Sequence, residues 1–233
     1  MIGIIGAMEI EISGLREQME DRQTEHISGV RFDWGTIHGV LCAVAVCGPG
    51  KVNAAVCAQA MVMRFHPRLI INSGVAGGIG ENVQIGDVVI ATAVVQHDMD
   101  TSPLGDPVGL ISGLNLIEIP ADEAASRLLA EHAQQIYHGG VFRGIIATGD
   151  QFMADRKKIE AIAEQFHAMA CEMEGGSIGQ VCYMNKTPFA ILRAISDNGN
   201  DDAVLDYPKF AQQAADRSVA LLTGALPLLD EAF

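Results

Sequence analysis

The sequence is short of aromatic and basic side chains, and both shortages narrow the possible functions. Phe, Trp and Tyr make up only 5% of the 233 residues, whereas glycine occurs 25 times. This combination is typical of an α/β protein whose loops pass close to a ligand, rather than of a β-sandwich. Lys and Arg number 15 against 29 Asp and Glu, a net charge of −14. Such a chain repels a phosphate backbone, so we predict no nucleic-acid partner and expect a neutral or zwitterionic small molecule. The charge can equally serve only to keep the chain soluble.

Paired cysteines and long apolar runs are also lacking. The five cysteines include no C-x-x-C pair, and an odd number within apolar runs indicates buried free thiols in a reducing compartment. The apolar start, residues 1–8, has no basic lead and is followed at once by Glu9 and Glu11, which favours a strand over a signal peptide. The longest apolar runs, such as residues 40–47, are too short to span a bilayer. We therefore expect a soluble, cytoplasmic protein without membrane contact.

Apolar runs of strand length alternate with segments of helical periodicity along the whole chain, which predicts one α/β domain over residues 1–233 with helices on both faces of a sheet. The last helix is predicted to begin with Asp206 as its N-cap and Pro208 in its first turn. Residues 96–115, rich in Gly, Pro, Ser and Asp, interrupt the alternation, and a loop of this length is usually a lid or a contact surface. The predicted strands are 2–6, 40–47, 69–71, 87–95, 141–147, 168–171 and 188–195, and the other predicted helices are 10–19, 51–65, 122–137, 155–166 and one from 174 onward.

Carboxylates gather at the ends of the predicted strands, where ligands bind in open α/β sheets. Glu11 follows the first strand, Glu172 and Glu174 follow a later one, and Asp197 comes at the end of the last. Their convergence indicates acid–base chemistry on an uncharged substrate. Taken singly, each has a simpler explanation: Glu11 can be solvated helix surface, Glu174 a charge at a helix N-terminus and Asp197 a cap.

Three motifs suggest ligands that the rest of the sequence does not support. Residues 48–51, Gly-Pro-Gly-Lys, resemble the end of a P-loop, but Val52 stands where Ser or Thr is needed. The glycines between 74 and 80 lack the G-x-G-x-x-G spacing and are better explained by close approach of a ligand or by a tight turn. The His-Asp-Met-Asp motif at 97–100 has no second His or Cys cluster, so a loop ordered by hydrogen bonds is a better explanation than a metal site. We predict no metal and no cofactor.

Together, the motifs at the strand ends resemble those of the 5′-methylthioadenosine/S-adenosylhomocysteine nucleosidases, which belong to the purine nucleoside phosphorylase and hydrolase superfamily. The likeness runs in matching order from residue 1 to about Phe210 and rests on 3–9 with Glu11, 73–78, 148–150, 172–174 and 193–197. It implies a central twisted mixed β-sheet flanked by helices, and a homodimer in which the partner subunit supplies part of the pocket for the 5′ group.

The resemblance also implies a role for each site residue. Glu11 is the base that activates the attacking water, Glu174 holds the ribose 2′-hydroxyl, and Asp197 is the acid at purine N7. Phe152 stacks near the base, and the backbone of Phe152 and Met153 reads its Watson–Crick edge. The remaining substrate-binding or supporting residues are Met8, Pro49, Val75, Gly77, Thr101, Glu172, Met173, Arg193, Ser196 and Tyr207.

The implied reaction is hydrolysis of the N-glycosidic bond of 5′-methylthioadenosine and S-adenosylhomocysteine, and also of 5′-deoxyadenosine, in methionine salvage. A purine nucleoside phosphorylase is an alternative, although Asn72 and Val75 stand where related phosphorylases place the Arg and Ser that hold phosphate. An aminodeoxyfutalosine hydrolase is a second alternative. A non-catalytic nucleoside-binding protein is a third, disfavoured because all three carboxylates are present.

Overall fold

The structure, a computed structural model, describes residues 1–198 and 203–233. In these residues the strands are β1 (Ile2–Gly6), β2 (Glu20–Ile27), β3 (Val30–Ile37), β4 (Val40–Val46), β5 (Leu69–Gly78), β6 (Val88–Gln96), β7 (Ile119–Pro120), β8 (Val141–Thr148), β9 (Ala168–Glu172) and β10 (Phe189–Asp197). The helices are α1 (Glu9–Glu17), α2 (Lys51–Phe65), the short 3-10 helix η1 (Ser102–Leu104), α3 (Glu123–Ile136), α4 (Arg156–Phe166), α5 (Gly175–Asn185) and α6 (Ala203–Ala232). None of the helices described is both long enough and apolar enough to cross a membrane.

One mixed sheet contains all of these strands, in the order β10-β6-β8-β9-β5-β1-β4-β3-β2, with β7 alongside β6. Strand β10 also pairs with β5, so β5, β10, β6, β8 and β9 close into a ring. Pairing is parallel for β1 with β4 and β5, and antiparallel where β10 meets β6 and where β9 meets β5. The predicted mixed α/β sheet is confirmed.

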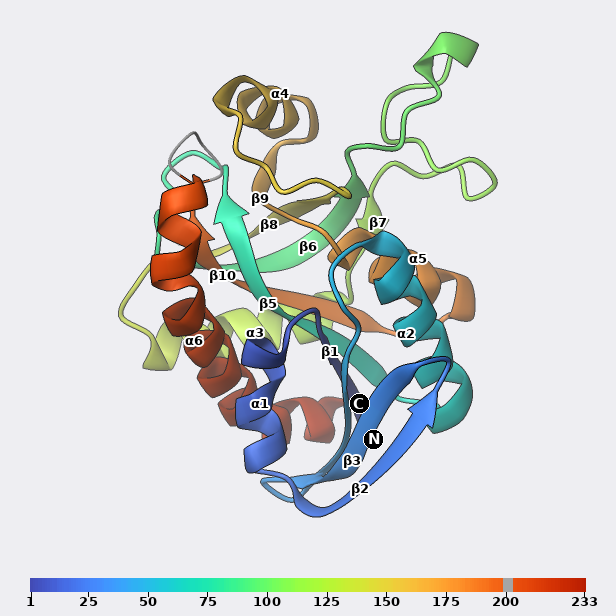
Figure 1. The fold of residues 1–233 in the computed structure, drawn as a ribbon, viewed down its shortest axis with the longest axis vertical. Helices are drawn as coiled ribbons and strands as arrows, with labels where there is room; N and C mark the ends of the chain where they lie inside the picture. The colour runs from blue at the N-terminus through green and yellow to red at the C-terminus, as the bar shows by residue number, and fades with distance from the viewer. Residues whose placement is uncertain (199–202) are drawn as a thin grey trace.

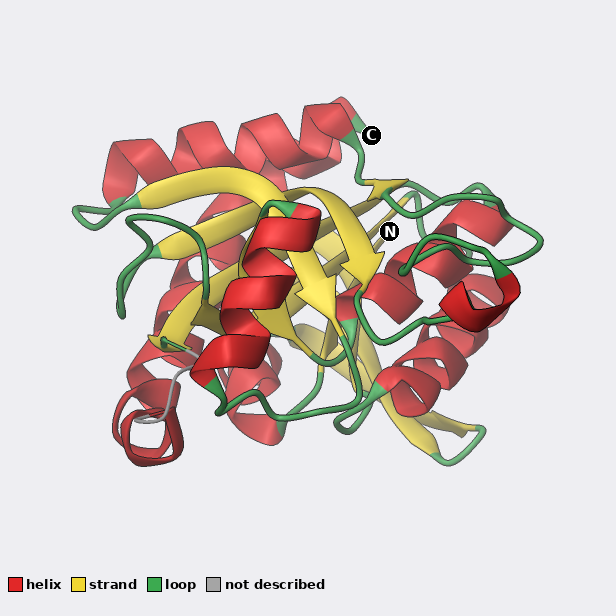
Figure 2. Ribbon diagram, turned by 90° about the horizontal axis from the view of Figure 1, so that it is seen from above, coloured by secondary structure: helices red, strands yellow, loops and turns green. Residues whose placement is uncertain are grey.

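Apolar side chains fill both faces of the sheet. On one face α2 and α5 pack on the strands through Cys57, Met61 and Ile178. On the other face α1, α3 and α6 do so, with Leu15 and Leu129 among the buried residues. Figures 1 and 2 show the two groups of helices on opposite sides of the strands. Strands buried on both faces require the continuous apolar runs that the sequence contains.

Most predicted elements are where the sequence places them, and the helix predicted at 51–65 has the same bounds as α2. The segment after β6, predicted as a long loop, contains only η1 and an isolated bridge between Ile111 and Leu116 before β7. It extends away from the body of the molecule as the green lobe of Figure 1.

Two predictions about element boundaries are wrong. Residues 74–78 are not a loop, because β5 continues through Gly78 and pairs there with β9 and β10. Asp206 is not an N-cap: α6 already includes Ala203, and Pro208 lies inside the helix. A helix tolerates an internal proline when its packing compensates for the lost hydrogen bond, and here the following residues Ala211 and Ala214 are buried.

Candidate active site

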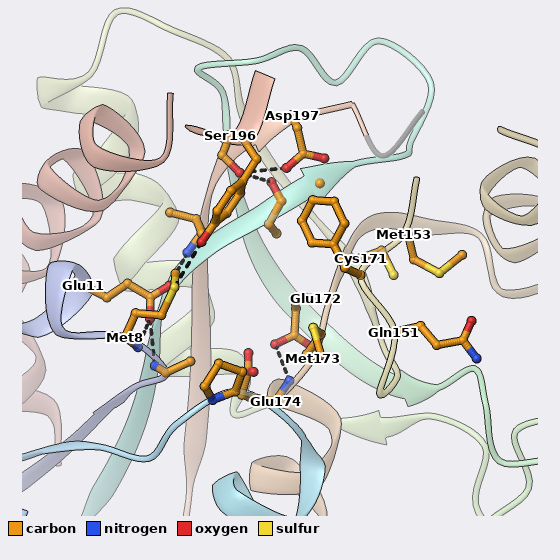
Figure 3. A pocket seen from close by; sticks show the side chains of 17 residues that line it. Met8, Glu11, Gln151, Met153, Cys171, Glu172, Met173, Glu174, Ser196 and Asp197 are labelled. Carbon is orange, nitrogen blue, oxygen red and sulfur yellow. Dashed lines mark hydrogen bonds between the residues drawn. The ribbon is translucent and has the colours of Figure 1, made fainter. Parts of the chain in front are cut away.

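The ends of two strands meet at Gly77 of β5 and form one wall of a cavity. Gly77 lies beside Asp197 of β10 and beside Cys171 of β9. Segments that follow β1, β4 and β8 contribute the other walls, and the cavity has a volume of about 210 Å³. Figure 3 shows Glu11, Glu174 and Asp197 on different sides of this space. Carboxylates from distant parts of the chain therefore surround one cavity.

Glu11 lies in the first turn of α1, and its carboxylate is buried and held by backbone amides. Its Oε2 accepts hydrogen bonds from the amides of Ala7 and Met8, at 2.7 and 2.9 Å, and its Oε1 accepts one from the amide of Val75 at 2.9 Å. This approach needs glycine at position 74, because a Cβ there would lie 2.3 Å from Glu11 Oε1. Three amide donors fix the orientation of the carboxylate at the edge of the cavity.

Glu172, the last residue of β9, touches the cavity but is occupied by protein donors. Its Oε1 accepts a hydrogen bond from the Thr148 hydroxyl, and its Oε2 accepts from the amides of Glu174 and Gly175 and from Arg193. The Arg193 side chain is only 1% exposed and donates to Asn72 as well. The buried Glu172–Arg193 ion pair lies behind the cavity wall. Removal of either partner would leave an uncompensated buried charge and would destabilise this wall.

Glu174 is the N-cap residue of α5 and is also buried, but its carboxylate is less fully engaged. Oε1 accepts a hydrogen bond of 2.9 Å from the amide of Gly50, in the segment after β4. Oε2 lies 3.9 Å from Arg193 Nη2, an ion pair without a hydrogen bond. Glu174 can therefore accept a hydrogen bond from a ligand hydroxyl.

Burial raises the pKa of two of these carboxyls. For Glu11, burial outweighs the opposing effect of the Arg193 charge. For Glu174, burial and the neighbouring Glu172 raise the pKa to about 7, while Arg193 and the Gly50 amide act in the opposite direction. Both groups bind a proton more tightly than an exposed glutamate does, which suits acid–base catalysis near neutral pH.

Asp197 is the last residue of β10 and is 3% exposed. Its Oδ2 accepts a hydrogen bond of 2.9 Å from the Ser196 hydroxyl, whose oxygen also lies 3.4 Å from the carbonyl of Ala76. The Asp197 carboxyl lies at the opposite end of the cavity from Glu11 and Glu174 (Figure 3). It is thus placed to reach a different part of a ligand.

The mouth of the cavity is mainly apolar. Phe152, which is 49% exposed, meets Tyr207 edge-to-face with ring centroids 5.6 Å apart. The Tyr207 hydroxyl donates a hydrogen bond of 3.0 Å to the sulfur of Met8, and Pro49 and Met173 add further apolar surface. A ligand here would meet carboxylates at both ends of the cavity and a thioether-lined, aromatic wall at its mouth.

Comparison with known proteins agrees with this arrangement. Residues 1–227 match the family model of the phosphorylase superfamily. The chain is 39% identical over 227 residues to a 5′-methylthioadenosine/S-adenosylhomocysteine nucleosidase of Geobacillus thermodenitrificans, and the match covers 97% of this chain and 96% of the relative. This chain belongs to the phosphorylase superfamily, among the 5′-methylthioadenosine/S-adenosylhomocysteine nucleosidases.

Solved structures of this family have the same fold. The nucleosidase of Neisseria meningitidis in complex with methylthio-immucillin-A superposes with a TM-score of 0.93 at 32% identity, covering 97% of both chains. A futalosine hydrolase of Helicobacter pylori superposes with a TM-score of 0.92 at 33% identity, covering 97% of this chain and 98% of that one. Nucleosidases and a futalosine hydrolase thus share this fold.

Most of the residues singled out in the sequence lie together around the cavity. Arg193 does not line it but stands behind Glu172 and Glu174, as a supporting residue would. Thr101 was expected in the pocket and does not line it: it lies in the segment after β6 and donates a hydrogen bond to Asp106. The predicted residues that line the cavity are Met8, Glu11, Pro49, Val75, Gly77, Phe152, Met153, Glu172, Met173, Glu174, Ser196, Asp197 and Tyr207.

Four further lining residues were not singled out. Ala7, Ala76 and Gln151 are immediate neighbours of residues that were, so sequence adjacency is the signal that points to them. Cys171 precedes Glu172 on β9, but a cysteine inside an apolar run is more simply explained as core. Its thiol is buried, and burial raises its pKa far above the usual range, so it is an uncharged wall of the cavity.

Proposed function

We propose that this protein hydrolyses the N-glycosidic bond of 5′-methylthioadenosine and S-adenosylhomocysteine, and also of 5′-deoxyadenosine, releasing adenine and the 5-substituted ribose. The observation that carries the proposal is the pairing of carboxylates with an apolar mouth in one cavity. Asp197 lies at the opposite end of the cavity from Glu11 and Glu174, and the Phe152–Tyr207 pair lies at the mouth (Figure 3). The family relationship supports the same activity.

Each carboxylate has a separate role in the proposed reaction. Asp197 donates a proton to N7 of adenine as the bond between C1′ and N9 breaks, so that adenine leaves as a neutral base. Glu11 accepts a proton from water while the water oxygen bonds to C1′. Glu174 accepts a hydrogen bond from the 2′-hydroxyl. The proton that Asp197 gives and the proton that Glu11 gains balance, and exchange with solvent restores both groups.

The electrostatics of the cavity favour this division of roles. The sugar gains positive charge as its bond to adenine stretches, and the ionised forms of Glu11 and Glu174 stabilise that charge in a site removed from water. Arg193 reduces the repulsion between these carboxylates from behind without entering the cavity. Binding of a hydroxyl donor and a cationic sugar favours the ionised form of Glu174, whose pKa is about 7 without ligand.

Water is a better nucleophile than phosphate in this site. Among the described residues that line the cavity none is Lys, Arg or His. Arg193 is engaged by Asn72 and Glu172, so it is not available to a second anion. A phosphate dianion near C1′ would meet Glu11 and Glu174 without a cation to compensate, which disfavours the phosphorylase alternative.

A hydrolase of a futalosine-type nucleoside is the second candidate, and the similarity to the Helicobacter pylori futalosine hydrolase supports it. The mouth of the cavity bears on this choice, because Phe152 and Tyr207 meet there in edge-to-face contact and make it apolar. The Met8–Tyr207 hydrogen bond and the apolar wall favour a thioether at the 5′ carbon, which 5′-methylthioadenosine and S-adenosylhomocysteine both carry.

We also infer a cytoplasmic homodimer that acts in methionine salvage. Two features support the dimer: Leu104 in the segment after β6 is 84% exposed, and Val52 and Met63 on α2 are 74% and 68% exposed. Thr101 then serves the pocket of the partner subunit rather than its own. The five buried, unpaired cysteines fit a reducing compartment. Light scattering tests the dimer, since a fully active monomer at micromolar concentration would contradict it.

One assay tests the reaction itself. The protein is incubated with 5′-methylthioadenosine in phosphate-free buffer and again with phosphate added, and adenine and the sugar product are quantified by chromatography. Hydrolysis predicts adenine and free 5-methylthioribose at a rate that phosphate does not change. Formation of the sugar 1-phosphate, or a rate proportional to phosphate concentration, would refute it. Parallel incubation with aminodeoxyfutalosine separates the second candidate.

A further inference from the structure

The first turn of α2 is anchored by acidic side chains from three other segments. The amide of Gly50 donates to Glu174 Oε1 at 2.9 Å, and the next amide, that of Lys51, donates to Asp150 Oδ1 at 2.7 Å. The first amides of a helix have no partner within it, so these carboxylates satisfy donors that would otherwise require water. Two successive amides thus join one catalytic carboxylate and one carboxylate of the segment after β8.

Asp98 closes this arrangement from a third segment, the one after β6. Its Oδ1 accepts a hydrogen bond of 2.6 Å from the Lys51 ammonium group, and its Oδ2 accepts one of 2.9 Å from the amide of Asp150. The side chains of Lys51 and Asp98 are about one-fifth exposed, which makes the ion pair stronger than one at the open surface. Asp98 therefore holds the Lys51 side chain and also Asp150, the residue that accepts from the Lys51 amide.

We propose that Asp98 is a positioning residue for Glu174: through Lys51 and Asp150 it holds the Gly50 amide on the Glu174 carboxylate. This inference rests on the proposed function, because it assigns Asp98 to the same active site. It gives a role to the His-Asp-Met-Asp motif at 97–100, to which the proposed function assigns no ligand. Asp98 itself does not line the cavity, so its effect passes through the backbone at residues 50 and 51.

A single residue, Gly50, joins the two anchored peptides. Gly50 has φ = 99°, a conformation that residues with a Cβ rarely adopt, and a Cβ there would lie 3.1 Å from Asp150 Oδ1. Because the two amides belong to successive residues, we expect a displacement of the Lys51 amide to shift the Gly50 amide as well. Loss of the Asp98 contacts should lengthen the hydrogen bond from Gly50 to Glu174 first.

The proton affinity of Glu174 reports this hydrogen bond. Burial raises its pKa most, followed by the repulsion of Glu172 on β9, and Glu11 on α1 adds to it. Arg193 on β10 and the Gly50 amide lower it. If the Gly50 amide moves away, the carboxylate loses a donor and the pKa of Glu174 rises further. Direct removal of the Asp98 charge acts the other way, because a lost negative charge favours ionisation.

The test measures the titration of Glu174 in wild type, Asp98→Ala and Asp98→Asn. The glutamate side-chain carbons are followed by ¹³C NMR in the ligand-free protein, with Glu174→Gln to assign the signal, and kcat/KM for 5′-methylthioadenosine is measured against pH. Asp98→Ala is expected to move the Glu174 titration and the acid limb of kcat/KM upward together by about one pH unit, and Asp98→Asn by less. Activity should recover at alkaline pH.

Glu123→Gln is the matched control, since it breaks the partly exposed Arg143–Glu123 ion pair between α3 and β8, away from the cavity. It should leave the titration unchanged. The inference is overturned if Glu174 titrates as in wild type in Asp98→Ala, or if its pKa falls, as the direct charge effect alone requires. The NMR titration needs no turnover, so failure of the proposed reaction would be seen separately, as absence of adenine release by the wild type.

Discussion

Asp197→Asn gives the sharpest test of the proposed chemistry. The side chain is 3% exposed and faces the cavity, and asparagine has nearly the same shape. Its amide oxygen can accept the hydrogen bond that Ser196 now donates to Asp197 Oδ2 at 2.9 Å. The substitution therefore leaves packing and substrate binding largely intact, while asparagine cannot transfer a proton to N7.

The expected loss follows from the value of one proton transfer. General acid catalysis contributes about 100-fold to 10,000-fold in rate, which corresponds to about 3–5 kcal/mol of transition-state stabilisation. We expect kcat for 5′-methylthioadenosine to fall by at least about 100-fold in Asp197→Asn, with a dissociation constant close to that of the wild type. Adenine release measures kcat, and calorimetric titration of the inactive variant measures binding.

Ser196→Ala is the matched control because it removes the donor but keeps the acid. A neutral hydrogen bond contributes about 0.5–1.5 kcal/mol, so Ser196→Ala should lower kcat by about tenfold at most. If Asp197→Asn retains near-normal turnover, or if both variants lose the same factor, proton donation by Asp197 is the wrong explanation.

Three more outcomes are expected. Burial gives Glu174 a folded-state pKa of about 7 against a usual value of 4.5, so its stabilising contribution is complete below about pH 4.5 and is lost as pH rises through 7. The free energy of unfolding should therefore fall by up to about 3 kcal/mol across this window in the wild type and by less in Glu174→Gln, as urea titrations at several pH values would show. Gly74→Ala should destabilise the protein and abolish activity, because the added Cβ would lie 2.3 Å from Glu11 Oε1 and 2.7 Å from Arg193 Nη1; a wild-type melting temperature would contradict this. Comparison of kcat/KM should rank 5′-methylthioadenosine first, S-adenosylhomocysteine second and adenosine last, since the hydroxyl of adenosine loses water beside Met8 and Phe152, and a higher value for adenosine would contradict the pocket assignment.

The central strands and the helices that cover them could be predicted from the sequence because their signals are local. Residues 51–65 repeat small and apolar side chains at helical spacing, the apolar run at 2–6 ends in glycine, and the run at 40–47 lies between Gly39 and Gly48. The β2–β3 hairpin was missed because β2 has no apolar alternation: five of its eight residues, from Glu20 to Thr24, are exposed in succession. The turn does carry a sequence signal, because Ser-Gly is a two-residue hairpin sequence. In the structure Ser28 and Gly29 both have the positive φ that such a turn requires.

Elements whose bounds depend on distant partners could not be predicted in this way. β5 continues through the glycines at 74, 77 and 78 because β9 and β10 pair with it there, and glycine-rich sequence normally indicates a turn. Thr101 was assigned to the pocket by its place in a motif. Its position in space depends on the path of a long segment with little secondary structure, and no local periodicity encodes that path.

The sequence identifies the four acidic residues of the site but not how their roles differ. Glu172 and Glu174 are two residues apart and chemically identical, yet Glu172 accepts hydrogen bonds from Thr148, from two amides and from Arg193, while Glu174 accepts one from Gly50. Apart from the two local amides, the donors come from the segment after β4 and from β8 and β10, so the folded sheet decides which carboxylate is neutralised and which stays available. That difference makes one glutamate a structural partner of Arg193 and leaves the other, with its pKa near 7, able to bind a sugar hydroxyl.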